Sequence, residues 1–201
     1  PTQEQLDYMR AAEKIINDPD AGTLRYINEL MNNNISPYLS QFYEGALPNA
    51  VTIVENSPKI KLMMELVRQL KIDNPEGGRI LFSPRGIELH EAMKEYLVKK
   101  VGYKDDEVEI LSGAVNVSDE KFEDIKDDFN SGKVKIIIGG DTIQRGVDLQ
   151  ENTTHVLRLS LPYRPDEITQ IEGRAWRHGN KWKRMMSGLI MMNDSIDPFL
   201  N

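Results

Sequence analysis

The sequence has 201 residues, a length that fits one compact domain with an appendage and is short for two full enzyme domains. Hydrophobic residues make up 39% of it and charged residues 28%, which excludes a collagen-like repeat and a wholly disordered chain. Cysteine is absent, so disulfides, cysteine-ligated metals and a thiol nucleophile are excluded and a cytoplasmic location is favoured. The net charge of −7 argues against a generally basic coat for nucleic acid, and neither a membrane span nor a secretion signal is recognisable.

The N-terminal quarter of the chain has the apolar spacing of helices. This spacing covers residues 3 to about 45 and is interrupted by a breaker at residues 17–22. Further along, Ser57 and Pro58 supply an N-cap followed by proline at the first helical position. They predict a helix over about residues 58–72.

From Arg79 onward, short apolar runs alternate with amphipathic stretches. The predicted strands are Ile80 to Phe82, Val108 to Leu111, Val134 to Ile138, Val156 to Leu159 and a last run near Met186 to Met192, and the predicted helices cover about residues 86–100, 118–130 and 166–176. This alternation predicts an α/β fold with a mainly parallel sheet and helices on both faces, which binds ligands beyond the carboxyl ends of its strands. We expect residues 1–50 to form a helical appendage and residues 51–201 to form the α/β unit.

The common catalytic signatures are absent from the sequence. It contains no GxxxxGK[ST], GxGxxG or GxSxG, and therefore no phosphate-binding loop of its own. The three histidines, His90, His155 and His178, are scattered without the spacing of metal ligands. We expect each to be a surface or core histidine, and no metal site is predicted.

One segment with chemical potential is GGDTIQRGVDLQ, at residues 139–150, directly after a predicted buried strand. Adjacent glycines allow a ligand to approach the backbone closely, and Asp141, Arg145 and Asp148 place charges at the ligand-binding edge. The alternative is a tight turn with its charges in water.

A second segment is QIEGRAWRHGN, at residues 170–180. Gln170, Arg174 and Arg177 are spaced four and three apart and form one stripe of the predicted helix. Two guanidinium groups on one stripe suit a phosphate, and the alternative is a pair of salt bridges to Glu167 or Glu172. Trp176 is expected in the core.

The surrounding stretch is basic. Seven basic and three acidic residues lie between Arg158 and Arg184, a local net charge of +4. A polyanion should therefore bind here, unless the stretch is simply a solvated basic surface.

These segments, taken together, resemble the motifs of superfamily 2 helicases and translocases. QIEGRAWRHGN resembles motif VI (QxxGRxxRxGQ), GGDTIQRGVDL resembles motif V, and ILFSPRG at residues 80–86 resembles motif IV. LSG at residues 111–113 looks like the end of the next strand, and HVLRLSLPYRP at residues 155–165 resembles a segment of Swi/Snf-like remodellers.

The resemblance covers about residues 57–201 and implies the second RecA-like lobe, the helicase C-terminal lobe. Residues 1–50 resemble, more weakly, the helical material that joins the two lobes. In these motors ATP binds between the lobes, and the second lobe offers arginine fingers that stabilise charge as the γ-phosphoryl group leaves.

The resemblance also implies roles for single residues. Arg174 and Arg177 are the expected catalytic arginine fingers, and Gln170, Gly146 and Asp148 are expected to bind the nucleotide.

A further set, Ser83, Arg85, Gly113 and Thr142, is expected to contact nucleic-acid phosphates without reading sequence. Thr142 is included because Gly140 stands where the family usually has Thr or Ser.

The implied cofactors are ATP and Mg²⁺, bound mainly by a first lobe that the sequence lacks. The chain is therefore expected to be a piece of a larger ATP-dependent helicase or translocase, inactive alone, with the first lobe of the same parent protein as a partner. Its other partner is expected to be DNA, with RNA as the alternative, and no membrane. The competing hypothesis is a non-catalytic nucleic-acid or protein-binding lobe of a degenerate helicase.

Overall fold

The computed structural model describes residues 1–16, 22–111, 119–140, 143, 148–160, 165–176 and 178–197. Its strands are β1 (Gly78–Phe82), β2 (Val108–Leu111), β3 (Ile136–Gly139), β4 (Thr153–Arg158) and β5 (Met186–Leu189). Its α-helices are α1 (Gln3–Ile16), α2 (Gly22–Ile35), α3 (Ala50–Glu55), α4 (Pro58–Asp73), α5 (His90–Tyr96), α6 (Asp119–Ser131) and α8 (Pro165–Ala175). Shorter helical turns are η1 (Pro37–Leu39), η2 (Ile87–Leu89), η3 (Leu97–Val101) and η4 (Asp105–Glu107).

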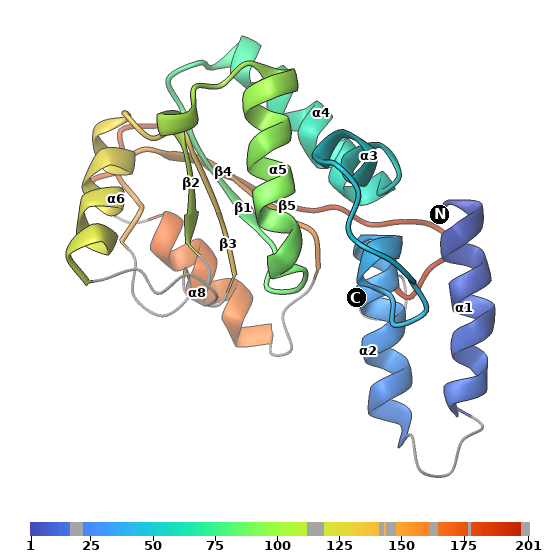
Figure 1. The fold of residues 1–201 in the computed structure, drawn as a ribbon. Helices are drawn as coiled ribbons and strands as arrows, with labels where there is room; N and C mark the ends of the chain where they lie inside the picture. The colour runs from blue at the N-terminus through green and yellow to red at the C-terminus, as the bar shows by residue number, and fades with distance from the viewer. Residues whose placement is uncertain are drawn as a thin grey trace.

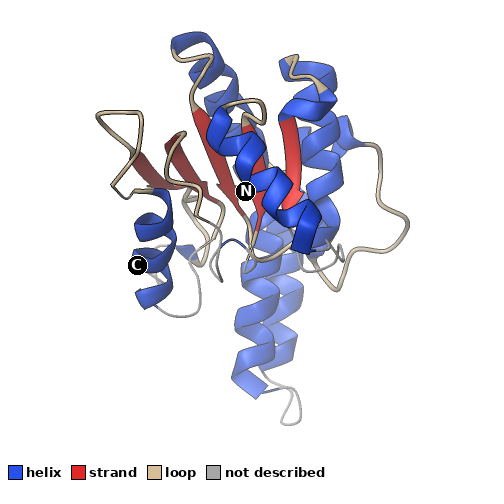
Figure 2. Ribbon diagram, turned by 90° about the vertical axis from the view of Figure 1, so that its left-hand side faces the viewer, coloured by secondary structure: helices blue, strands red, loops and turns tan. Residues whose placement is uncertain are grey.

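The described strands form one parallel sheet in the order β2-β3-β1-β4-β5. β1 lies at the centre and pairs with β3 on one side and with β4 on the other. Figure 2 shows the strands side by side in one sheet. All carboxyl ends therefore meet at one edge. The predicted α/β fold with a parallel sheet is confirmed.

Helices cover both faces of the sheet. α4 and α5 lie on one side and α6 and α8 on the other (Figure 1). Strand residues alternate between two apolar clusters, since Leu81 packs with α4 and α5 whereas Ile80 and Phe82 pack with α6 and α8. Nearly continuous apolar strands such as Ile136 to Ile138 are what a sheet buried on both faces requires.

Two antiparallel helices precede the α/β unit, and they stand beside it as a separate pair (Figure 1). Buried amides join them: Gln5 Nε2 donates to the Asn33 carbonyl at 2.5 Å, and Asn33 Nδ2 donates to the Gln5 carbonyl at 2.8 Å. The end of α2 belongs to the main body, because Ile35 packs with Ile53 and Val54 of α3. No helix in the described part of the chain has both the length and the apolar character needed to cross a membrane. The division near residue 50 stays a prediction.

A buried ion pair ties the C-terminal segment to both helical regions. Lys59 of α4 lies 2.9 Å from Asp197, and their side chains are 1% and 7% exposed. Asp197 also accepts hydrogen bonds from Asn34 Nδ2 at 2.6 Å and from the Met192 amide at 2.8 Å. Burial lowers the pKa of Lys59, and the charge of Asp197 opposes that shift. One carboxylate thus joins α2, α4 and the segment after β5.

The predicted strands are all present, but only β2 has its predicted bounds, and two of the differences have a local cause. β3 begins at Ile136 instead of Val134, because the Val134 amide donates to the Asp128 carbonyl at the end of α6. β4 begins at Thr153, three residues before the predicted start. The hydroxyls of Thr153 and Thr154 donate to the carbonyls of Leu149 and Gly78, so these polar residues can be buried in the strand.

Replacing Asp197 by alanine should lower the free energy of unfolding by about 3–5 kcal/mol, because it leaves the buried Lys59 ammonium without a counter-ion. The exposed pair Lys99–Glu95 supplies the matched control, and Lys99→Ala should change that free energy by less than about 1 kcal/mol. Chemical denaturation measures both. Equal effects of the two variants would contradict the assigned role of the buried pair.

Candidate nucleotide and nucleic-acid site

The segments that resemble motifs IV and V meet where β1 and β3 end. The Ser83 amide donates to the Gly139 carbonyl at 2.7 Å, which extends the ladder beyond both strands. A Cβ atom on Gly139 would lie 2.2 Å from the Leu111 carbonyl oxygen, and one on Gly140 would lie 2.8 Å from Pro84 Cα. The paired glycines are therefore needed for close packing of three chain segments. This packing explains why Gly140 carries no hydroxyl side chain.

The loop after β1 is held from inside. Ser83 is 1% exposed, and its hydroxyl donates to the Arg85 carbonyl at 2.6 Å. The carbonyl of Ser83 lies 3.0 Å from Nε2 of buried His90, at the start of α5. Because a carbonyl can only accept, Nε2 carries the proton. Burial lowers the pKa of His90, so the neutral ring supports the loop.

Arg85 connects this loop to the N-terminal helices. Its Nη1 donates to Asn32 Oδ1 at 3.3 Å and its Nη2 donates to Asn28 Oδ1 at 3.1 Å, both on α2. Leu39, from the turn after α2, packs against Gly86, where a Cβ atom would lie 2.7 Å from Leu39 Cδ1. The loop that resembles motif IV is thus anchored on the helical appendage.

The helix that resembles motif VI has one buried face and one open face. Ile171 and Ala175 of α8 are fully buried against the sheet. Gln170 is exposed, and a Cβ atom on Gly173 would meet nothing within 4 Å. The backbone of Arg174 continues the helix one turn after Gln170. α8 therefore presents the Gln170 side of its surface away from the core.

Several predicted site residues fall outside the described part of the structure. They are Gly113, Thr142, Gly146 and Arg177, together with the side chain of Arg174. Their assigned roles stay predictions.

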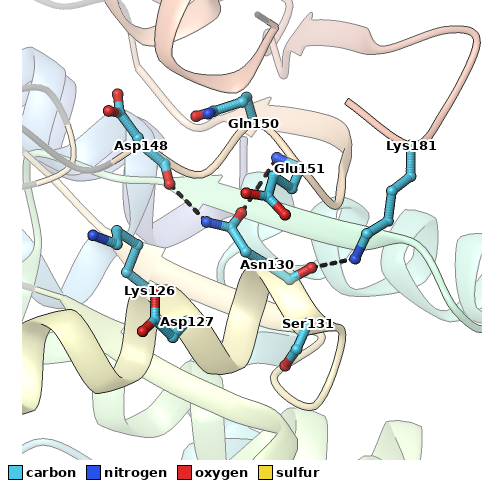
Figure 3. A pocket seen from close by; sticks show the side chains of 8 residues that line it. All are labelled: Lys126, Asp127, Asn130, Ser131, Asp148, Gln150, Glu151 and Lys181. Carbon is cyan, nitrogen blue, oxygen red and sulfur yellow. Dashed lines mark hydrogen bonds between the residues drawn. The ribbon is translucent and has the colours of Figure 1, made fainter. Parts of the chain in front are cut away.

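Asp148 lines an open polar pocket of about 460 Å³ between the end of α6, the segment before β4 and the loop after α8. Figure 3 shows Asn130 bridging these three pieces. Asn130 Nδ2 donates to the Asp148 carbonyl at 2.9 Å, its Oδ1 accepts from the Glu151 amide at 3.3 Å, and its carbonyl accepts from Lys181 Nζ. The pocket carries charges of both signs, from two lysines and three carboxylates, and its residues are Lys126, Asp127, Asn130, Ser131, Asp148, Gln150, Glu151 and Lys181.

The structure corrects two expectations about the basic stretch. Trp176 is 45% exposed, so its predicted place in the core is wrong; α8 ends at Ala175, and the indole lies beyond the buried face. Arg158 is 7% exposed and bonds Glu172 of α8 at 3.2 Å, so it is not part of a solvated basic surface. The sequence signal for this pair was an arginine at the end of an apolar strand with an acid on the following helix.

The three histidines lie at different depths in the structure. His90 is buried, His155 is half-buried and His178 is exposed. Among the described residues, no group of three or more histidine, aspartate or glutamate side chains could hold a metal ion.

Comparison with known proteins assigns the family. The model of the helicase conserved C-terminal domain matches residues 58–179, and the chain belongs to this family. The helicase C-terminal domain that the motifs implied is therefore confirmed.

Two solved structures show the same fold. The C-terminal part of the Fun30 ATPase domain superposes with a TM-score of 0.60 at 19% identity, over 98% of this chain and 63% of that one. Domain 2 of the DEAD-box helicase Mss116p, bound to an RNA duplex, superposes with a TM-score of 0.56 at 22% identity, over 68% of this chain and 51% of that one. The chain thus spans less than two thirds of either structure. Among curated proteins, none matches the sequence significantly.

Introducing the hydroxyl that the family usually has, by Gly140→Thr, should lower the free energy of unfolding by about 1–3 kcal/mol, because the new Cβ meets the Pro84 backbone. Gly173→Ala is the control, since its Cβ enters open space on a helix and should stabilise the chain by about 0.5–1 kcal/mol. Denaturant titration of both variants gives the two values. If the Gly140→Thr variant were as stable as the native chain, the loop after β1 could move away from the new side chain without cost. That result would contradict the packing role assigned to Gly140.

The stability of the chain should fall as the pH drops below about 6.5, the ordinary pKa of histidine. The lowered pKa values of His90 and His155 mean that the unfolded chain binds more protons there, so stability is full above that pH and is lost below it. Denaturant unfolding at pH 7.5 and 5.5 measures the loss. His90→Gln, which keeps a donor for Ser83, should reduce the loss, and an unchanged pH dependence in this variant would contradict the assignment.

Proposed function

We propose that the chain is the C-terminal motor lobe of an ATP-dependent DNA helicase or translocase of the Swi/Snf type. In this proposal it supplies arginine fingers and nucleic-acid backbone contacts to a larger parent protein. The observation that carries the proposal is the open face of α8, because Ile171 and Ala175 anchor the helix on the sheet and leave the Gln170 side accessible. A partner that carries a nucleotide can approach this face.

The proposal places the nucleotide and its Mg²⁺ on the open side of α8, where Gln170 is exposed. The pocket beside Asp148 is not part of this support, because it lies where the chain enters β4 and β5 and its three carboxylates outnumber its two lysines. Arg174 and Arg177 are the groups assigned to the γ-phosphate, where a guanidinium can donate two charge-assisted hydrogen bonds. The nucleotide would supply the phosphoryl group whose transfer to water drives movement. The arginines would stabilise the negative charge that spreads over its oxygens in the transition state.

Nucleic acid would be contacted at the edge where the strands end. Arg85 lies in the loop after β1, beside the glycines that end β3, whereas Ser83 is buried and supports this loop from inside. Motors that move along a strand use contacts to the phosphate backbone, which are independent of sequence. With a net charge of −7, such contacts have to be few and local.

The competing function is a nucleic-acid or protein-binding lobe without a catalytic role. A pure binding module has no need of paired arginines in the QIEGRAWR segment, which favours the motor. The same residues make this alternative testable, because only the motor depends on them for turnover.

In the parent protein, Arg177→Ala should lower DNA-stimulated ATP hydrolysis by about 10³-fold or more, because the finger acts in the transition state. Binding of duplex DNA should stay unchanged. Steady-state hydrolysis and fluorescence anisotropy measure the two quantities, with duplex RNA as the comparison substrate. The isolated chain should show no turnover, since its sequence has no phosphate-binding loop. A parent protein that binds DNA but never hydrolyses ATP would establish the binding lobe instead.

A further inference from the structure

Helix α2 contains four asparagines, and each of their side chains contacts a segment outside the helix. Asparagine is one of the less favourable residues in a helix interior, because its short amide competes for backbone hydrogen bonds. Asn33 Nδ2 donates to the Gln5 carbonyl of α1 at 2.8 Å, and Asn34 Nδ2 donates to Asp197 Oδ1 at 2.6 Å. These buried contacts fix α2 against α1 and against the segment after β5.

The other two asparagines of α2 hold the guanidinium of Arg85. Asn28 and Asn32 are one turn apart, so both side chains leave the same side of the helix. Arg85 Nη2 lies 3.1 Å from Asn28 Oδ1, and Arg85 Nη1 lies 3.3 Å from Asn32 Oδ1. A planar guanidinium that is bound at both terminal nitrogens cannot turn about a single contact. α2 therefore sets both the position and the plane of this group.

Both of these acceptors on α2 are neutral amides. A guanidinium has five N–H donors, and the two contacts use one donor on each terminal nitrogen. An aspartate at either position would form an ion pair with Arg85 and would bring a negative charge to this side of the loop. The amides orient the guanidinium and add no charge that opposes the approach of a phosphate.

The contact lies at the edge of the sheet where the strands end, because Arg85 is in the loop after β1. The side chains of Asn28, Asn32 and Arg85 are all partly exposed, so a ligand at this edge can reach them. Leu39, just after α2, packs against Gly86 of the same loop. The loop and the N-terminal helices are thus held together at two points.

We propose that Asn28 and Asn32 are positioning residues for nucleic-acid binding, which hold the Arg85 guanidinium ready for a phosphate of duplex DNA. The N-terminal helices are then a working part of the nucleic-acid site and not only a connection between lobes. This inference rests on the function proposed above, in which Arg85 contacts the phosphate backbone. Asn28 and Asn32 act through Arg85.

Asn32→Asp in the parent protein tests the inference, because it replaces a neutral acceptor with a carboxylate of nearly the same size. The affinity for labelled duplex DNA should fall by about tenfold, since the new ion pair competes with the phosphate for Arg85. The slope of log Kd against log salt concentration should decrease by about one. The midpoint of thermal unfolding should not fall, because an ion pair replaces a neutral hydrogen bond. A role limited to stability would instead leave DNA affinity and its salt dependence native.

The double variant Asn28→Ala/Asn32→Ala separates orientation from charge. Alanine favours the helix and releases the guanidinium without neutralising it. DNA affinity should fall severalfold, because Arg85 must then be immobilised when DNA binds, whereas the salt slope should stay native.

Gln41→Glu is the matched control for the added charge. The Oε1 atom of Gln41 accepts a hydrogen bond from Arg25 Nη2 at 2.9 Å, so this variant also converts an amide that binds an arginine into a carboxylate in the N-terminal region. DNA affinity and the salt slope should stay native. If Gln41→Glu weakens DNA binding as much as Asn32→Asp does, the effect is one of general charge and the positioning role is overturned.

Arg85→Ala, measured by the same fluorescence anisotropy titration, separates the remaining outcomes. If Arg85→Ala weakens DNA binding and Asn32→Asp binds DNA as the native protein does, the positioning role is overturned and the DNA site stands. If Arg85→Ala keeps native affinity, Arg85 is not a phosphate contact and the inference fails, while the motor function is still judged by ATP hydrolysis. A native parent protein that binds no duplex DNA and hydrolyses no ATP would overturn the proposed function itself.

Discussion

The parallel pairing of β1 with both neighbours is the constraint on which the rest of the structure depends. Because β3 and β4 run in the same direction as β1, the loop after Phe82, the glycines after Ile138 and the end of β4 all reach one edge. Such pairing buries the sheet on both faces and requires helices to return the chain each time. The helix that resembles motif VI, α8, is one of these connecting helices. The topology of the sheet therefore determines where it lies relative to the other motifs.

Buried polar contacts then fix the orientation of helices that apolar packing alone leaves adjustable. Fully buried Arg79 of β1 donates to the Gly77 carbonyl at 2.7 Å and to the Leu70 carbonyl at 2.6 Å, and so holds the end of α4 on the sheet. The Asp197 carboxylate joins α2 and α4 in the same way. Such groups lose hydration when they are buried, and specificity of arrangement is the role best suited to them. Arg158 belongs to this class, because its buried side chain bonds Glu172 of α8.

The sequence predicted the fold because its signals are local. Pro58 at the first helical position and the apolar run of β2 lie within single elements, and the structure has these elements where they were predicted. The N-cap role of the Ser57 side chain is not confirmed, because its hydroxyl donates to Ser36 Oγ at 2.7 Å and makes no capping hydrogen bond. The contacts that shape the site are different, since each depends on which segments the fold brings together. Asn130 and Asp148 are 18 residues apart and Arg85 and Asn32 are 53 apart, and no periodic pattern indicates such pairs. The exposure of Trp176 was not predicted for the same reason. Burial of an aromatic side chain just beyond a helix end depends on which other segments pack against it.

The most direct test of the central claim is the affinity of the parent protein for ADP with aluminium fluoride, which imitates the transferring phosphoryl group, compared with ADP alone. Arginine fingers should stabilise the transition state much more than the bound product. Arg174→Ala should therefore weaken binding of the analogue by on the order of 10²-fold or more and leave ADP affinity unchanged. Equal affinity of the native and variant proteins for the analogue would contradict the account, because the lobe would then hold no group that acts on the leaving phosphoryl.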